Sequence, residues 1–102
     1  MTNFEKISEE LKRAKTKHPV FCKAILSKRA SLKEIRETLK SCRDEIDEGN
    51  ATSDIILMEE LCEAYEAYKM KNYDSCLTEL AKCGAVIVRM MEWVQSEMEE
   101  VK

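Results

Sequence analysis

The sequence predicts an all-α protein built as an antiparallel bundle of about four helices. Only 2 of its 102 residues are Gly and 1 is Pro, which leaves few breaks for the turns of a sheet protein. Charged residues make up 36% of the chain, as amphipathic helices with solvated outer faces require. This length fits one domain, so residues 1–102 are predicted to form a single all-α domain.

The first predicted helix is short and ends ahead of a proline. Thr2 or Asn3 can cap it, and its apolar residues recur at helical spacing to about Lys15. Pro19 disfavours helical backbone at the residue before it, so residues 17–21 are predicted to form a connection. The apolar residues that follow suggest a short helical or irregular segment.

The second predicted helix has a clear start and a clear end. Ser31 and Glu34 form the capping-box pattern S-x-x-E. Gly49 suits the left-handed position that follows a helix, so the helix should end just before it. The residues predicted to face inward are Leu32, Ile35, Leu39, Cys42 and Ile46.

The third and fourth predicted helices are joined by a short turn. Thr52 or Ser53 can cap the third, which ends near Lys69, and the fourth runs from Tyr73 or Asp74 to about Glu100. The residues predicted to form the core between them are Leu57, Leu61, Leu80, Cys83, Ile87 and Met91.

The fourth helix is apolar on two sides, which places it in the centre of a bundle or at a subunit interface. Gly84 within it lowers helix propensity and favours close packing of another helix at that point. We therefore expect a homo-oligomer.

Charge is unevenly distributed along the chain. Residues 1–43 hold 12 basic and 5 acidic side chains, and residues 44–102 hold 5 and 15, so charges of +7 and −10 give the net −3. Either the two halves pack together with complementary charge, or the basic half also serves an anionic ligand. The acidic balance and the lack of an aromatic–basic stripe argue against nucleic-acid binding.

Cysteine usage and hydropathy suggest a cytoplasmic protein. The number of cysteines is odd, no CxxC pair occurs and His18 is the one histidine, so a zinc site is not expected. Four of the five cysteines lie in apolar helical stripes, where they act as small apolar side chains. The N-terminus lacks an apolar signal core, and the apolar runs are too short to span a membrane.

The stretch Ile55–Tyr68 mixes apolar and acidic residues most densely. Its residues Glu59, Glu60 and Glu63 are three or four positions apart or adjacent, so their carboxylates share one patch of a helix. Either this is a solvated acidic face, or Mg²⁺ or a basic partner relieves the repulsion, since hard cations prefer carboxylate oxygens.

The fourth helix adds further charges at matching spacing. Lys82 and Arg89 are seven residues apart, and Glu79 precedes Lys82 by three. Arg89 lies in an apolar run, where it is expected either in an ion pair, with Glu92 or Glu63, or on a phosphate. We predict one polar site with Glu59, Glu60, Glu63 and Glu79 as metal ligands and Lys82, Arg89 and Glu63 as ligand-binding residues.

These residues resemble a known family. Residues 59–63 read E-E-L-C-E and match E-E-x-x-E, the first half of the motif of MazG-like all-α nucleoside triphosphate pyrophosphatases. The second half, E-x-x-D, corresponds to residues 79–82, which read E-L-A-K, and the likeness covers about Ile55–Met91. The resemblance implies a Mg²⁺ site and an oligomer with sites near subunit interfaces. Residues 17–21, K-H-P-V-F, resemble the opening of short, often phage-encoded relatives.

The sequence departs from the family at one position. Lys82 stands where the family has its last metal-binding Asp, and an ammonium group cannot bind Mg²⁺. The resemblance then implies a catalytically degenerate member that binds a nucleotide or phosphate without efficient hydrolysis. A phage-encoded protein of this kind would sequester a nucleotide signal in the host cytoplasm. No residue is assigned a catalytic role.

Two alternatives stay open. One is a working Mg²⁺-dependent nucleoside triphosphate pyrophosphohydrolase, in which Glu66 or Glu92 supplies the carboxylate that Lys82 displaced. The other is a helical protein-interaction module with no small ligand.

Overall fold

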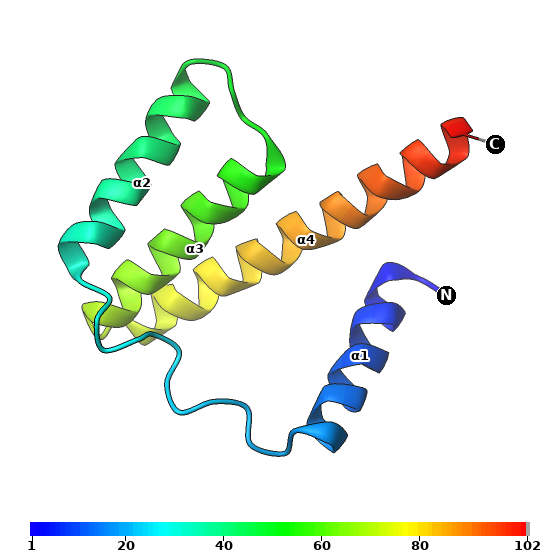
Figure 1. The fold of residues 1–102 in the computed structure, drawn as a ribbon, viewed down its shortest axis with the longest axis horizontal. Helices are drawn as coiled ribbons and strands as arrows, with labels where there is room; N and C mark the ends of the chain where they lie inside the picture. Colours follow the sequence, from blue (N-terminus) through cyan, green and yellow to red (C-terminus); the bar gives the residue numbers. More distant parts are fainter. Residues whose placement is uncertain (102) are drawn as a thin grey trace.

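The chain folds into four α-helices in a computed structural model that describes residues 1–101 (Figure 1). The helices are α1 (Asn3–Lys17), α2 (Leu32–Asp47), α3 (Ser53–Lys69) and α4 (Tyr73–Val101). No strand occurs in residues 1–101, so the predicted all-α class with four helices is confirmed. The segment between α1 and α2 is irregular throughout.

The N-terminal caps of α1 and α2 follow the sequence signals. The backbone N–H of Glu5 donates to Oγ1 of Thr2, and the N–H of Thr2 donates to Oε1 of Glu5, both at 3.1 Å. At α2 the N–H of Glu34 donates to Oγ of Ser31 at 3.1 Å. Each bond satisfies a backbone N–H that has no partner inside its helix.

Two helices end in the same backbone turn. Gly49, directly after α2, has φ +91°, and Lys71, after α3, has φ +60°. In both turns the next residue's N–H donates to a carbonyl five residues back, at 2.9 Å after α2 and 2.8 Å after α3. This is a Schellman motif, which needs a left-handed residue. The prediction for Gly49 is confirmed, whereas Lys71 adopts the conformation without the freedom of glycine.

The helices lie side by side in a thin layer. α3 packs against α2 on one side and α4 on the other, and α1 contacts α4 alone among the helices of residues 1–101. α4 extends well past α2 and α3, and α1 lies beside this extension (Figure 1). The molecule measures 46 × 42 × 22 Å, so its short dimension holds about two helix diameters of 10–12 Å.

The contact between α1 and α4 includes a pair of side-chain hydrogen bonds. Nδ2 of Asn3 donates to Oε1 of Gln95 at 3.2 Å, and Nε2 of Gln95 donates to Oδ1 of Asn3 at 2.8 Å. Both side chains are half-buried, and α1 itself contains no buried residue. This reciprocal pair and the contact of Ile7 and Leu11 with Met91 together position α1 on α4.

The best-packed region lies between α2 and α3. Ile35, Leu39 and Cys62 form its buried cluster, and Leu26 from the irregular segment and Tyr65 from α3 pack against it. The prediction that cysteines serve as small apolar side chains is confirmed, because the four on helices are all buried: Cys42, Cys62, Cys76 and Cys83.

The core predicted between α3 and α4 is partly wrong. Cys83 is buried there, but Leu80 and Ile87 are 38% and 42% exposed. α3 leaves this side of α4 exposed, and within residues 1–101 α1 reaches it only near Met91. Likewise, a Cβ added at Gly84 would have no neighbour within 4 Å, so the close helix packing expected there is not made within the chain.

No helix in residues 1–101 combines the length and apolarity needed to cross a membrane. Even α4, with 29 residues, carries charged side chains along its whole length.

Leu39→Ala should lower the free energy of unfolding by about 2–5 kcal/mol, because it removes a buried side chain from the centre of the α2–α3 contact. Urea denaturation followed by circular dichroism measures the change. Lys33→Ala, on the exposed face of the same helix, is the control and should change stability by less than about 0.5 kcal/mol. Equal effects of the two changes would contradict this position of the core.

The two helix ends should respond to substitution in opposite directions. Gly49→Ala should lower stability by about 1 kcal/mol, because a Cβ disfavours the left-handed backbone although space is open around it. Lys71→Gly should raise stability by a few tenths of a kcal/mol, since relief of strain exceeds the added chain entropy. Thermal unfolding of both variants provides the test, and the same sign for both would exclude this account.

Candidate metal centre

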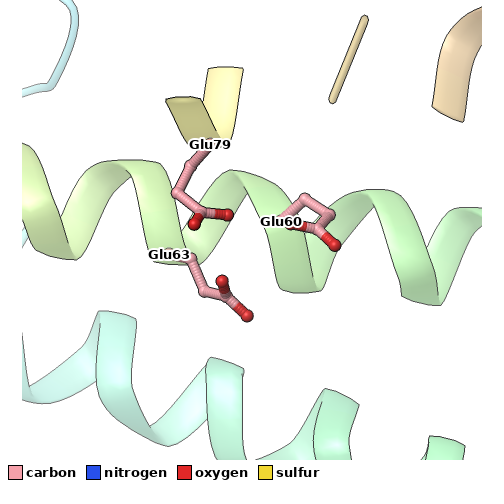
Figure 2. A group of neighbouring side chains, drawn as sticks. All are labelled: Glu60, Glu63 and Glu79. Carbon is pink, nitrogen blue, oxygen red and sulfur yellow. The ribbon is translucent and has the colours of Figure 1, made fainter. Parts of the chain in front are cut away.

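Three carboxylates from two helices meet at the contact between α3 and α4. Glu60 and Glu63 are three residues apart and therefore lie on neighbouring turns of one side of α3. Glu79 reaches toward them from the first half of α4 (Figure 2). One carboxylate oxygen of each residue lies within 4.8 Å of the other two. We call these three residues the carboxylate cluster.

Two oxygens of this cluster have no hydrogen-bond partner. All three side chains are half-buried, and Oε2 of Glu60 and Oε2 of Glu79 are shielded from solvent without a donor in residues 1–101. A buried polar atom without a partner typically costs about 1–3 kcal/mol, and more when it is charged. The cluster is therefore a place where a proton or a cation would be stabilised.

The protonation of Glu60 reflects this environment. Burial is the main cause that raises the pKa of Glu60 to about 7, followed by a hydrogen bond with Glu79 and by the charges of Glu63 and Glu79. Two ionised carboxylates cannot hydrogen-bond to each other, so these oxygens lack a donor until Glu60 takes up a proton. Lys82 opposes the rise through its positive charge.

The other two cluster residues shift in opposite directions. Burial, a hydrogen bond with Glu79 and the charge of Glu79 raise the pKa of Glu63, against a hydrogen bond from Arg43. Burial acts to raise the pKa of Glu79 too, but hydrogen bonds with Lys82, Glu60 and Glu63 outweigh it and lower that pKa. Glu79 is therefore the member that holds its charge most firmly.

Arg43 on α2 is a residue of this site that we did not predict. Its Nη2 lies 3.3 Å from Oε1 of Glu63, and its Nε lies 3.8 Å from Oε2 of Glu59. Two turns before Arg43 on α2, Nε of Arg36 lies 2.8 Å from Oε2 of Glu66. The signal was present in the sequence, because two arginines seven residues apart on one helix match the acidic spacing of the next.

The remaining predicted ligands lie around the cluster. Glu59 lies outside the group of converging oxygens and faces Arg43. Nζ of Lys82 lies 3.1 Å from Oε1 of Glu79 and so neutralises one of the three charges. The structure thus brings together Glu60, Glu63, Glu79 and Lys82, as the sequence suggested.

Arg89 lies in a separate hollow further along α4. That pocket has a volume of about 810 Å³, and none of the cluster residues lines it. Arg89 forms no ion pair within residues 1–101, and Glu63, one of its expected partners, pairs with Arg43 instead. The pocket is lined by Ala51, Thr52, Ser53, Ile56, Val86, Arg89, Met90, Glu92, Trp93 and Ser96.

The pocket and the cluster lie one turn apart along the same two helices. Ile56 in its wall precedes Glu60 by one turn of α3, and Val86 follows Lys82 by one turn of α4. Along the axis of α4, Arg89 lies about 10 Å beyond Lys82, at 1.5 Å per residue. The contact between α3 and α4 therefore carries the acidic groups, and the pocket beyond it carries the guanidinium of Arg89.

The cluster fits a small hard cation in its donor atoms. Mg²⁺ takes oxygen ligands at about 2.1 Å in an octahedron, so its ligand oxygens lie roughly 3–4 Å apart. Oxygens within 4.8 Å need modest side-chain shifts to reach that geometry. Glu60, Glu63 and Glu79 would supply the ligands, and a bound Mg²⁺ would offer its other positions to water or phosphate oxygens.

Comparison of the chain with protein-family models, with curated proteins and with solved structures finds no match in any of the three. The structure therefore establishes an all-α, four-helix protein with a cluster of glutamates able to hold a metal ion.

Glu60 makes stability depend on pH in a defined direction. Between the ordinary value of 4.5 and about 7, the folded state keeps a proton that the unfolded state has lost. Stability without divalent metal should therefore fall as the pH rises from 5 to 7, by on the order of 2 kcal/mol, and change little above pH 8.

Glu60→Gln should remove most of this pH dependence and stabilise the metal-free protein at pH 8. Denaturation with EDTA at several pH values tests it, with Glu37→Gln on the exposed face of α2 as the matched control. A pH dependence identical to that of the unaltered protein would show that Glu60 is not the group responsible.

Proposed function

We propose that this protein binds Mg²⁺ at the carboxylate cluster and, through it, a nucleotide or another phosphate ligand, without efficient hydrolysis. The carrying observation is the convergence of three carboxylates from two helices, with two oxygens that lack any partner. A structural ion-pair network would place a cation against each buried oxygen, and Lys82 and Arg43 reach one oxygen each.

The resemblance to MazG-like nucleoside triphosphate pyrophosphatases supports the same function. Glu60 and Glu63 belong to the E-E-x-x-E half of that motif, and Glu79 begins the second half. Three of the four acidic positions that the resemblance singles out have converging oxygens, whereas the fourth, Glu59, faces Arg43. We therefore place the chain, as a proposal, among the short and degenerate members of that class.

The basic residues along this part of α4 suit a phosphate chain. Lys82 occupies the position of the family's last Asp and is half exposed, so its ammonium group can turn from Glu79 toward a phosphate. Arg89 has no protein partner in residues 1–101, and its planar guanidinium can bind two phosphate oxygens at once. Trp93 in the same pocket offers an aromatic surface on which a base can stack.

Hydrolysis finds less support, because it needs a replacement for the missing Asp. Glu66, one of the two candidates, is engaged by Arg36 at 2.8 Å. Glu92, the other, lines the pocket beside Arg89. The ammonium of Lys82 also repels a second cation, so one Mg²⁺ is favoured over a pair.

A thermal-shift screen of nucleoside mono-, di- and triphosphates, with Mg²⁺ or with EDTA, tests the proposal. A ligand at 100 times its dissociation constant should stabilise the protein by about 2.7 kcal/mol, or roughly 10 °C. Glu63→Gln should abolish the part of this shift that depends on Mg²⁺, and Glu37→Gln should leave it intact. Arg89→Ala should weaken binding more than Arg89→Lys, which keeps the charge.

The screen also separates the alternatives. Release of pyrophosphate from a triphosphate by the unaltered protein would establish the hydrolase. If no nucleotide shifts the melting temperature of the folded protein, the remaining alternative is the protein-interaction module with no small ligand.

Lys82→Asp is a sharper test of the degenerate-enzyme account. It replaces the ammonium with a carboxylate and completes the E-x-x-D half of the motif. Mg²⁺ affinity should rise, and pyrophosphate release from a triphosphate should appear above the level of the unaltered protein. Lys82→Asn, which removes the charge without adding a full carboxylate, is the control. Weaker Mg²⁺ binding by Lys82→Asp would contradict the assignment.

A further inference from the structure

α4 carries a long apolar seam that the chain itself leaves open. Its residues alternate by three and four, which is the a and d spacing of paired helices. The four at the first position are Leu77, Gly84, Met91 and Met98. The four at the second are Leu80, Ile87, Val94 and Val101. We call these eight residues the α4 seam, and it runs along most of the helix.

The seam is exposed at both of its ends. Leu77 at its start is 66% exposed, and Val94, Met98 and Val101 at its other end are 55%, 60% and 86% exposed. Met91 is half-buried because Ile7 and Leu11 of α1 lie across from it. Paired helices bury these positions, so the distal half of α4 has the pattern of an interface without its partner.

α1 extends the same apolar surface. Phe4 is 72% exposed, and Ile7 and Leu11 are also exposed although they lie next to Met91. Figure 1 shows α1 beside the part of α4 that projects beyond α2 and α3. The two helices therefore present one broad apolar face, which we call the α1–α4 face.

The total exposed surface measures how much is left uncovered. The accessible surface is 8279 Å², whereas a folded monomer of 11.8 kDa is expected to expose about 5,900 Å². The radius of gyration is 15.9 Å, against about 13 Å for a compact domain of this length. The excess of roughly 2,400 Å² per chain includes the irregular segment, where Val20 and Phe21 are exposed, and at most doubles to an area within the range of obligate homodimers.

We infer that the α1–α4 face binds a second copy of this chain, so that α1 and α4 of two copies form a four-helix bundle about a twofold axis. The excess surface is of the size that such a pair buries. Gly84 in the seam has open space where its side chain would be, which lets a partner helix approach closely.

Charge favours a second copy over an unrelated protein. α1 carries five basic and three acidic side chains, while residues 88–101 at the end of α4 carry one basic and four acidic. A twofold axis sets each basic α1 near the acidic α4 end of the other copy, because such an interface uses the same patch twice. The surface is complementary to itself.

This inference does not rest on the proposed function. Glu79 directly precedes Leu80 of the seam, so it lies about 100° from that residue around the axis of α4, and its side chain meets Glu60 and Glu63 of α3. The carboxylate cluster would therefore remain open in each copy, and pairing should occur in EDTA as well as in Mg²⁺.

Analytical ultracentrifugation of the full chain in EDTA tests the inference. The unaltered protein should sediment at twice its chain mass of 11.8 kDa at micromolar concentration, with a melting temperature that rises with concentration. The double variant Ile87→Lys/Val94→Lys should sediment as a single chain, its dissociation constant raised on the order of 100-fold or more. Ser96→Lys adds the same charge to α4 outside the seam and should stay dimeric.

The sedimentation of the unaltered protein tests the inference by itself. It remains a valid test even if the double lysine variant fails to fold. If the unaltered protein still sediments as a single chain at 100 times the micromolar concentration, the inference is overturned. Binding of a hydrophobic dye would then assign the face to another protein. A dimer that survives the double lysine variant, with helix content unchanged by circular dichroism, also overturns it.

Discussion

The carboxylates of α3 have neighbours on two sides, because α3 lies between α2 and α4. An acidic helix at the edge of the layer could turn its glutamates to water, but α3 cannot do so fully. Arg36 and Arg43 of α2 therefore pair with the glutamates on one side. On the other side α4 supplies Lys82 together with another acid, Glu79. The excess of acid over base at that contact is what creates the carboxylate cluster.

The layered arrangement also explains why the core is small. Three helices packed in a row bury one face of the outer helices and two of the middle one. The best apolar packing is accordingly between α2 and α3, around Leu39. The apolar residues of α4 outnumber the positions that α3 can cover, so the rest form the α4 seam. The polar site and the apolar seam are two consequences of one geometry, on adjacent sides of the same helix.

The candidate site could be predicted in part, because helical spacing is a local property. Glu60 and Glu63 share a side of α3 by their separation alone, and Lys82 is one turn from Glu79. That Glu79 faces them across the contact depends on how α3 and α4 are aligned, which the family resemblance suggested and spacing could not. The role of Arg43 was missed because pairing α2 with α3 requires knowing which faces meet. Arg89 shares a helical line with Lys82, yet two turns of helix carry it into a different hollow.

The sequence by itself determined the class, the four helices and nearly all their ends. Caps at Thr2 and Ser31 and the left-handed turn at Gly49 act within a few residues, so they are legible without a structure. Only the tertiary structure decided which apolar stripe is core. Leu80 and Ile87 have the same helical spacing as buried residues. The hydrophobic effect favours burial of such side chains, but it does not specify which surface packs against them. The surface that covers an apolar side chain is set by long-range packing, and within residues 1–101 that packing leaves Leu80 and Ile87 exposed.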